Sequence, residues 1–128
     1  RHPELFSSSV PLSASLGPQT LEKMKDFTYL GYSRSNLNQK DYERYRKRNN
    51  PLYLVDKIDK KTLNSVRWYI DCGDDDYLYE ANSLMHIKLR KKGVKHEFRV
   101  RDGDHNWTYW RSALPSVLEF VSKKFRGS

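Results

Sequence analysis

The fold of this 128-residue chain is decided by the stretch Ser65-Val66-Arg67-Trp68-Tyr69-Ile70-Asp71-Cys72-Gly73-Asp74-Asp75-Asp76. Residues 65–71 are rich in β-branched and aromatic side chains, which predicts a strand that ends at Gly73. Apolar residues then recur at helical spacing over 77–92, and two lysines and a glycine at 91–93 predict the end of that helix. A strand followed directly by a helix is typical of a βαβ unit.

The sequence on either side continues this alternation. Residues 94–101 alternate between apolar and polar side chains, which predicts a second strand, and residues 7–14 predict a short upstream strand interrupted by a proline. Residues 21–61 form a polar, aromatic segment, for which we expect helices, a loop near 31–38 and a helix beginning at Pro51. The last helix is predicted from one apolar stripe, made of Trp107, Trp110, Leu114, Leu118, Val121 and Phe125.

The order of elements therefore predicts the α/β class, with about three parallel strands and flanking helices. Crossover connections of this kind place adjacent strands parallel. In such sheets, ligands and reactive side chains lie in the loops at the carboxyl ends of the strands.

Composition excludes several classes of protein. Aromatic residues make up 13% of the chain, too many for a disordered tail, while no apolar run reaches the roughly 20 residues of a membrane helix. The single cysteine, Cys72, excludes an internal disulfide and a multi-cysteine zinc site. It leaves the cellular compartment undetermined.

Two polar clusters follow the two main predicted strands. One is the acidic run at 74–76, and the other is Gly103-Asp104-His105. Parallel neighbouring strands would bring both loops to one edge of the sheet. An aspartate next to a histidine there would form the orienting acid and the general base of a nucleophilic triad.

Each of these clusters also has a plainer structural alternative. Aspartates before a helix commonly cap its N-terminus, and Asp76 directly precedes the helix expected from residue 77. A divalent cation is a further possibility, but the glycine precedes the acids instead of lying among them, so we expect no metal site. A histidine after a turn is also often only a surface residue.

The runs at 69–82 and 101–111, together with the opening residues 1–8, resemble the C-terminal half of the family called "putative esterase". That family comprises α/β-hydrolases related to esterase D, S-formylglutathione hydrolase, and feruloyl and tributyrin esterases. The resemblance covers nearly all of residues 1–128 and is weakest over 21–61. It implies the C-terminal part of a single α/β-hydrolase domain, with 21–61 as a variable helical insert.

The resemblance implies a serine carboxylesterase in which Asp76 is the triad acid and His105 the general base. The substrates it implies are acylated sugars, feruloyl or acetyl esters, or short-chain esters, and it requires no cofactor. The family's Gly-x-Ser-x-Gly elbow does not occur in this sequence. We therefore expect the nucleophile and the oxyanion hole to lie upstream, and the chain alone to be inactive.

Aromatic residues beside the two clusters are the candidate substrate-binding residues. We expect Trp107, Tyr109 and Tyr77 to line the ester pocket, since aromatic walls suit phenolic or sugar esters. Packing of the last helix on the sheet is the alternative role for Trp107 and Trp110, whereas Tyr109 lies off the apolar stripe.

The net charge of +8 raises the alternative of a non-catalytic module that binds a polyanion such as nucleic acid. The densest basic run, at 44–48, follows acids at 41 and 43, which favours a solvated helix face, so we expect no nucleic-acid partner. Loss of an upstream neighbour would leave the first strand unpaired. We therefore expect this sheet edge to pair with a missing N-terminal half or with a second copy.

Overall fold

The computed structural model describes residues 2–26 and 37–125. Its three-stranded sheet has the order β1-β2-β3, with β1 at Ser8–Ser9, β2 at Arg67–Gly73 and β3 at His96–Arg101. Both pairings are parallel, and the β2–β3 register runs from Trp68 opposite His96 to Gly73 opposite Arg101. The expected fold class is confirmed, with the carboxyl ends of β2 and β3 at one edge.

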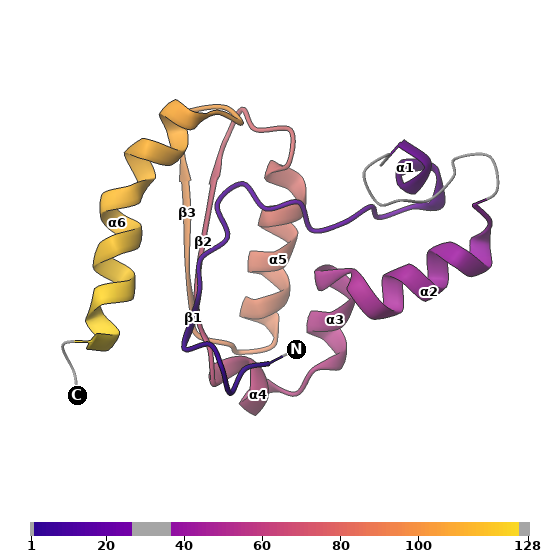
Figure 1. The fold of residues 1–128 in the computed structure, drawn as a ribbon, viewed down its shortest axis with the longest axis horizontal. Helices are drawn as coiled ribbons and strands as arrows, with labels where there is room; N and C mark the ends of the chain where they lie inside the picture. The colour runs from indigo at the N-terminus through magenta and orange to yellow at the C-terminus, as the bar shows by residue number, and fades with distance from the viewer. Residues whose placement is uncertain (1, 27–36, 126–128) are drawn as a thin grey trace.

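Helices cover both faces of this sheet (Figure 1). The helix α5 packs on one face of β2, and α6 packs on the other face. The helices between β1 and β2 extend away from the sheet on the α5 side. The bounds of the helices are α1 Leu21–Asp26, α2 Gln39–Asn49, α3 Pro51–Lys57, α4 Lys60–Asn64, α5 Tyr79–Lys91 and α6 Trp107–Phe125.

Local signals set several helix ends. Asn38 caps α2 in a reciprocal capping box with Asp41, and Asn50 caps α3, which begins at Pro51 as predicted. The stop after α5 is also confirmed, because Gly93 has a positive φ of 69° that an L side chain adopts at a cost. The helix α4 was not predicted, although Asp59 accepts from the backbone N–H of Thr62 in an ordinary cap.

The main core lies between α5, the α3–α4 segment and one face of β2 (Figure 1). Ile70 of β2 contributes to it together with Met85 and Leu89 of α5. A second, smaller cluster joins α1 and α2 through Met24, Leu37 and Tyr42. None of the helices in the described part of the chain is long and apolar enough to cross a membrane.

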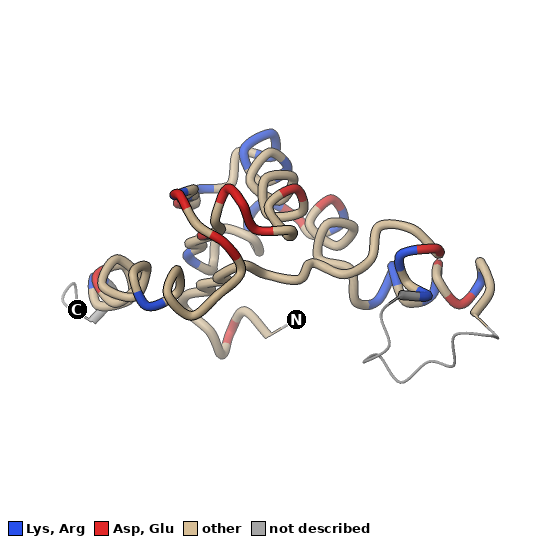
Figure 2. The backbone as a smooth tube through the Cα atoms, turned by 90° about the horizontal axis from the view of Figure 1, so that it is seen from above, with Lys and Arg blue, Asp and Glu red and all other residues tan. Residues whose placement is uncertain are grey.

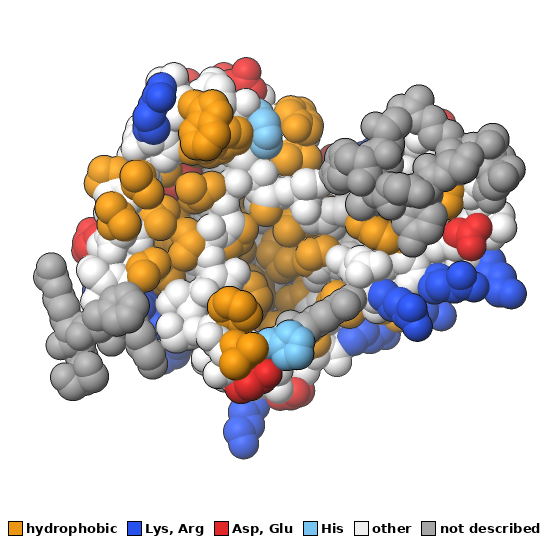
Figure 3. Space-filling model, viewed as in Figure 1, with side chains coloured by type: hydrophobic (Ala, Val, Ile, Leu, Met, Phe, Trp, Pro, Cys, Tyr) orange, Lys and Arg blue, Asp and Glu red, His pale blue; other side chains and the backbone are white. Residues whose placement is uncertain are grey.

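The predicted buried face of α6 is wrong. The helix buries Tyr109, Ala113 and Phe120, and the rings of Phe120 and Tyr69 lie 5.3 Å apart. The predicted stripe instead leaves Trp107, Leu114 and Leu118 exposed. Figure 3 shows hydrophobic side chains gathered over α6 on the viewer's face. The fully buried Ala113 permits the helix to lie close to the sheet, which selects this face.

The upstream strand and the loop at 31–38 differ from expectation or lie outside the described residues. The upstream strand is shorter than predicted, with two residues in β1 and one isolated bridge between Leu12 and Asp71. Pro11 separates these pairings, although its carbonyl accepts from the N–H of Asp71. Most of the loop predicted at 31–38 lies outside the described residues.

Candidate active site

The loops that follow β2 and β3 are hydrogen-bonded to each other at the carboxyl edge of the sheet. The Asp75 N–H donates to the Gly103 carbonyl (3.1 Å), and the Gly103 N–H donates to Asp74 Oδ1 (3.0 Å). Figure 2 looks down on this edge and shows acidic positions grouped there. Reciprocal bonding of this kind fixes the two loops relative to one another, as the parallel topology predicted.

Asp76 and His105 make direct contact across these loops. The distance from His105 Nδ1 to Asp76 Oδ2 is 2.9 Å, so the expected contact is confirmed. An ionised carboxylate can only accept, which places the proton on Nδ1 and leaves Nε2 as the free basic nitrogen. The Asp76 side chain is fully buried, whereas that of His105 is 27% exposed. His105 therefore faces outward from a buried carboxylate.

Asp76 is held as a carboxylate despite its burial. Burial alone would raise the pKa of Asp76, but hydrogen bonds from Ser13, the Leu78 N–H and His105 outweigh it and lower the pKa from its usual 3.8. The Leu78 N–H donates to Asp76 Oδ1 at 2.8 Å. Donors on both carboxylate oxygens thus fix the orientation of the group that faces His105.

Aromatic rings surround the imidazole. The Tyr77 ring centroid lies 4.8 Å from that of His105, and the Trp110 ring meets it edge to face at 4.9 Å. Trp107 packs in turn against Trp110 at 5.2 Å. Tyr77 and Trp107 are 74% and 71% exposed, so Tyr77 presents aromatic surface to solvent next to His105, and Trp107 does so next to Trp110.

Tyr109 lies elsewhere. It is 4% exposed, and its hydroxyl donates to Asp71 Oδ1 in the interior at 2.5 Å. This burial favours a structural role over the substrate-binding role expected from the sequence. The packing alternative for Trp107 is also not supported, because most of that side chain is exposed.

The sequence reasoning missed two polar residues beneath the site. Asp71 is fully buried in β2 and accepts from Tyr69, Tyr109 and Arg101. An acid within the otherwise apolar run 68–72 is a signal that could have identified it, since a buried charge needs partners. Ser13 is 5% exposed and bonds to groups of the site, and no local pattern marks it.

Three exposed acids, Asp74, Asp75 and Asp102, offer ligand atoms within 4.8 Å of one another. Such clusters of exposed carboxylates also occur without a metal. Asp74 already accepts from the Gly103 N–H, which gives this acid a structural role in the loop contact.

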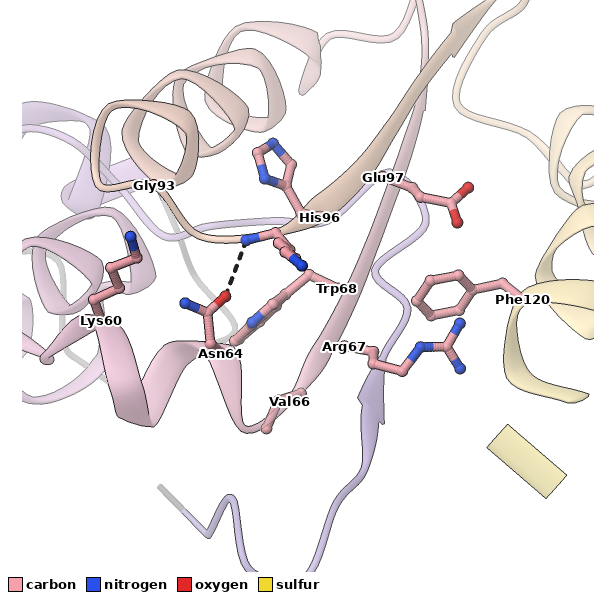
Figure 4. A pocket seen from close by; sticks show the side chains of 10 residues that line it. Lys60, Asn64, Val66, Arg67, Trp68, Gly93, His96, Glu97 and Phe120 are labelled. Atoms are coloured by element: carbon pink, nitrogen blue, oxygen red, sulfur yellow. Dashed lines mark hydrogen bonds between the residues drawn. The ribbon is translucent and has the colours of Figure 1, made fainter. Parts of the chain in front are cut away.

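A cavity of about 610 Å³ lies at the opposite end of the sheet, where β2 and β3 begin (Figure 4). Basic side chains line it, but Figure 4 shows Lys60 beside Gly93 and Arg67 beside Phe120, on opposite sides of the strands. Glu97 lies among them. These cations do not converge on one point, as a binding site for a phosphate group requires.

Two arginines of the basic run in α2 pair with acids of the same helix. Arg46 contacts Glu43 at 3.1 Å, and Arg44 lies 4.0 Å from Asp41. The guanidinium of Arg46 also lies over the Tyr53 ring at 4.6 Å. These contacts agree with a solvated helix face and add nothing to the polyanion alternative.

A parallel sheet covered by helices on both faces, with a buried acid against an outward histidine at its carboxyl edge, defines the α/β-hydrolase class. The family model described as "Putative esterase" matches residues 1–121, and the chain belongs to that family. The family resemblance identified from the sequence is thereby confirmed.

Several known proteins are similar to this chain. A ferulic acid esterase of known structure is 33% identical with a TM-score of 0.71, and the match covers 95% of this chain and 43% of that one. A fluorophosphonate-binding serine hydrolase from Staphylococcus aureus is 26% identical with a TM-score of 0.66, covering 90% and 44%. S-formylglutathione hydrolase from the same organism is 25% identical with a TM-score of 0.58, covering 90% and 41%.

A curated acetyl esterase from Caldicellulosiruptor saccharolyticus is 27% identical over 70 residues, which are 55% of this chain and 26% of that protein. The chain thus spans less than half the length of each of these relatives.

Proposed function

We propose that this chain supplies the acid and the base of a Ser-His-Asp triad in a serine carboxylesterase. In this proposal Asp76 orients His105, and His105 is the general base. The observation that supports it most is the 2.9 Å contact between His105 Nδ1 and a fully buried Asp76. The family membership and the names of the similar proteins point to the same chemistry.

The proposed reaction uses the free Nε2 of His105. A serine hydroxyl attacks the ester carbonyl while Nε2 takes its proton, and the resulting imidazolium is stabilised by the Asp76 carboxylate. The same proton then passes to the leaving alcohol as the C–O bond breaks, which leaves an acyl-serine. Water attacks the acyl group in a second cycle, with His105 again as base, and releases the acid and the free serine.

The nucleophile in this proposal comes from outside the 128 residues, since they contain no Gly-x-Ser-x-Gly elbow. We propose that these residues are the C-terminal half of one hydrolase domain and are inactive alone. The partner is then an N-terminal half, or a second copy, that pairs with β1. This strand lies at an edge of the described sheet, and an unpaired edge invites pairing.

The proposed substrates are acetyl, feruloyl or short-chain esters, including acylated sugars. The exposed rings of Tyr77, which lies beside His105, and of Trp107, which packs on Trp110, support an aromatic or sugar group in the substrate. If so, Tyr77→Ala and Trp107→Ala raise KM for methyl ferulate more than for p-nitrophenyl acetate. Equal changes for the two esters would contradict the substrate assignment and leave the reaction class untouched.

Hydrolysis of p-nitrophenyl acetate by the full-length protein that contains these residues tests the reaction itself. We expect His105→Ala and Asp76→Asn each to lower kcat by about 10³-fold or more, as loss of a triad member does in serine hydrolases. Asp75→Asn is the matched control, because Asp75 is a neighbouring, exposed acid and should leave kcat unchanged. Full activity in Asp76→Asn or His105→Ala would refute the proposal.

A further inference from the structure

Four side chains from four separate segments form a closed ring of contacts around the candidate acid. Asp76 contacts His105, and His105 meets the edge of Trp110 at 4.9 Å. The Trp110 indole Nε1–H donates to Ser13 Oγ at 2.9 Å, and Ser13 lies close enough to Asp76 to help lower the pKa of that carboxyl group. We call these residues the contact ring.

The chemistry of the groups in the contact ring fixes which of them donate protons and which accept them. An indole N–H can only donate, so the Ser13 hydroxyl accepts from Trp110 and retains its own proton to give. The groups that could receive this proton are the Asp76 carboxylate and the Cys72 sulfur, both of which lie close to Ser13. A sulfur is a weak acceptor and a carboxylate a strong one, so the proton goes to Asp76.

We propose that Ser13 is a positioning residue for the acid–base pair, holding the Asp76 carboxylate aimed at His105, with Trp110 orienting the Ser13 hydroxyl. This inference rests on the proposed function. Ser13 acts only through Asp76 and touches neither the substrate nor the reacting atoms. It is also not the missing nucleophile, because Ser13 is 5% exposed and its Oγ already accepts from Trp110 inside the protein.

The backbone around Ser13 supports this role. Ser13 has a φ of 48°, a left-handed conformation that costs free energy for a residue with a side chain. Its N–H donates to the Asp71 carbonyl of β2 at 2.8 Å. The next residue, Ala14, exchanges two hydrogen bonds with the buried Asn82 side chain of α5. A strained residue held from both sides is typical of functional positions.

Asn82 also connects the backbone around Ser13 to the loop that carries Asp76. Its amide donates to the Leu78 carbonyl at 2.9 Å, and the Leu78 N–H donates to Asp76. The left-handed residue and the loop that carries the acid are therefore fixed by one buried side chain. A change of side chain at Ser13 can then alter the hydroxyl contact without releasing the backbone.

The test uses the full-length protein and two readouts, the titration of the Asp76 carboxyl carbon by NMR and the kinetics with p-nitrophenyl acetate. Ser13→Gly removes the hydroxyl and suits the positive φ. We expect the pKa of Asp76 to rise and kcat to fall about tenfold with little change in KM, as for loss of a hydrogen bond to a charged group. Ser7→Gly, at an exposed serine, is the matched control and should change neither quantity.

Trp110→Phe is the second variant, and it decides the question if Ser13→Gly does not fold. It keeps an aromatic ring at this position and removes the indole N–H, although the phenyl ring is smaller than the indole. We expect a smaller rise in the pKa of Asp76 and a fall in kcat of about threefold.

The outcomes separate this inference from the proposed function. An unchanged Asp76 titration in the folded Ser13→Gly protein, or a raised pKa with unchanged kcat, overturns the positioning role. An Asp76→Asn protein with full activity overturns the proposed function instead. A merely structural role of Ser13 would lower stability and leave the Asp76 titration unmoved, which also counts against the inference.

Discussion

Gly73 and Gly103 lie so close together that neither the β2 loop nor the β3 loop has room for a side chain at this point. A Cβ atom on Gly73 would lie 2.0 Å from the carbonyl oxygen of Gly103. Gly103 itself has a φ of 144°, and a Cβ there would lie 2.6 Å from the Tyr109 ring. The approach of the Asp76 loop to the His105 loop therefore depends on glycine at both positions.

The first prediction follows from this contact. Gly73→Ala should force the two loops apart, lower the free energy of unfolding by about 1–3 kcal/mol and reduce the proposed esterase activity. Urea unfolding and p-nitrophenyl acetate hydrolysis by the full-length protein measure the two effects. Gly93→Ala is the control, because its Cβ would meet only the flexible Lys60 side chain. It should cost about 1 kcal/mol through its left-handed backbone and leave activity intact. Equal loss of activity in both variants would contradict the loop-contact argument.

The second prediction concerns Cys72. Burial, followed by the nearby charge of Asp76, raises the pKa of this thiol to about 12, and the residue is 1% exposed. At mildly alkaline pH it is thus both protonated and shielded, and we expect Ellman's reagent to react only after unfolding in guanidinium. Rapid labelling of the native protein would show that the interior beside Asp76 opens readily.

The third prediction concerns His86, whose ring stacks on Phe98 at 4.4 Å and whose Nδ1 lies 2.7 Å from His96 Nε2. Burial, then the charges of His96 and Arg90, lower the pKa of His86 from 6.5. A lowered histidine pKa means that the unfolded chain takes up the proton first. The contribution of neutral His86 to the free energy of unfolding is fully present above pH 6.5, and it is lost as the pH falls through the pKa of the folded state.

Thermal unfolding as a function of pH measures this effect. Tm should fall on acidification below pH 6.5 in the unmodified protein, and His86→Leu should weaken that dependence. His2→Leu is the control at an exposed histidine. A His86→Leu profile parallel to that of the unmodified protein would assign the acid sensitivity to other groups.

The fourth prediction tests the outward face of α6 and the edge strand β1. Leu114 and Leu118 are 46% and 59% exposed. If a partner covers them, the isolated chain should associate as its concentration rises, and Leu114→Lys with Leu118→Lys should reduce that association. Light scattering measures it. A compact, well-folded monomer at all concentrations would argue against the proposed partner.

Features set by local sequence were predictable. The end of α5 at Gly93, the start of α3 at Pro51 and the meeting of the acidic loop with the His105 loop follow from caps, turns and the geometry of parallel strands. The choice of Asp76 among the three aspartates came from the resemblance to the esterase family. These signals act over a few residues, or depend on topology alone.

Features set by tertiary contact were not predictable. The apolar period of α6 selected Leu114 and Leu118 as core, but the bond from Tyr109 to Asp71 and the close approach at Ala113 turn the opposite face inward. The left-handed conformation of Ser13 could not be predicted from the sequence either. Serine has no preference for positive φ, and the partners that hold it lie far away in the sequence.

The buried carboxylate of Asp71 has a consequence for how this sequence can change over evolution. It gathers two tyrosine hydroxyls and the Arg101 guanidinium, at 2.6 Å, in the middle of the sheet. Removal of one partner leaves an unpaired charge in the interior, whereas replacement of the whole group by apolar residues of similar volume is often tolerated. Homologous sequences should therefore keep these four positions together or exchange them together, and single departures among them should be rare.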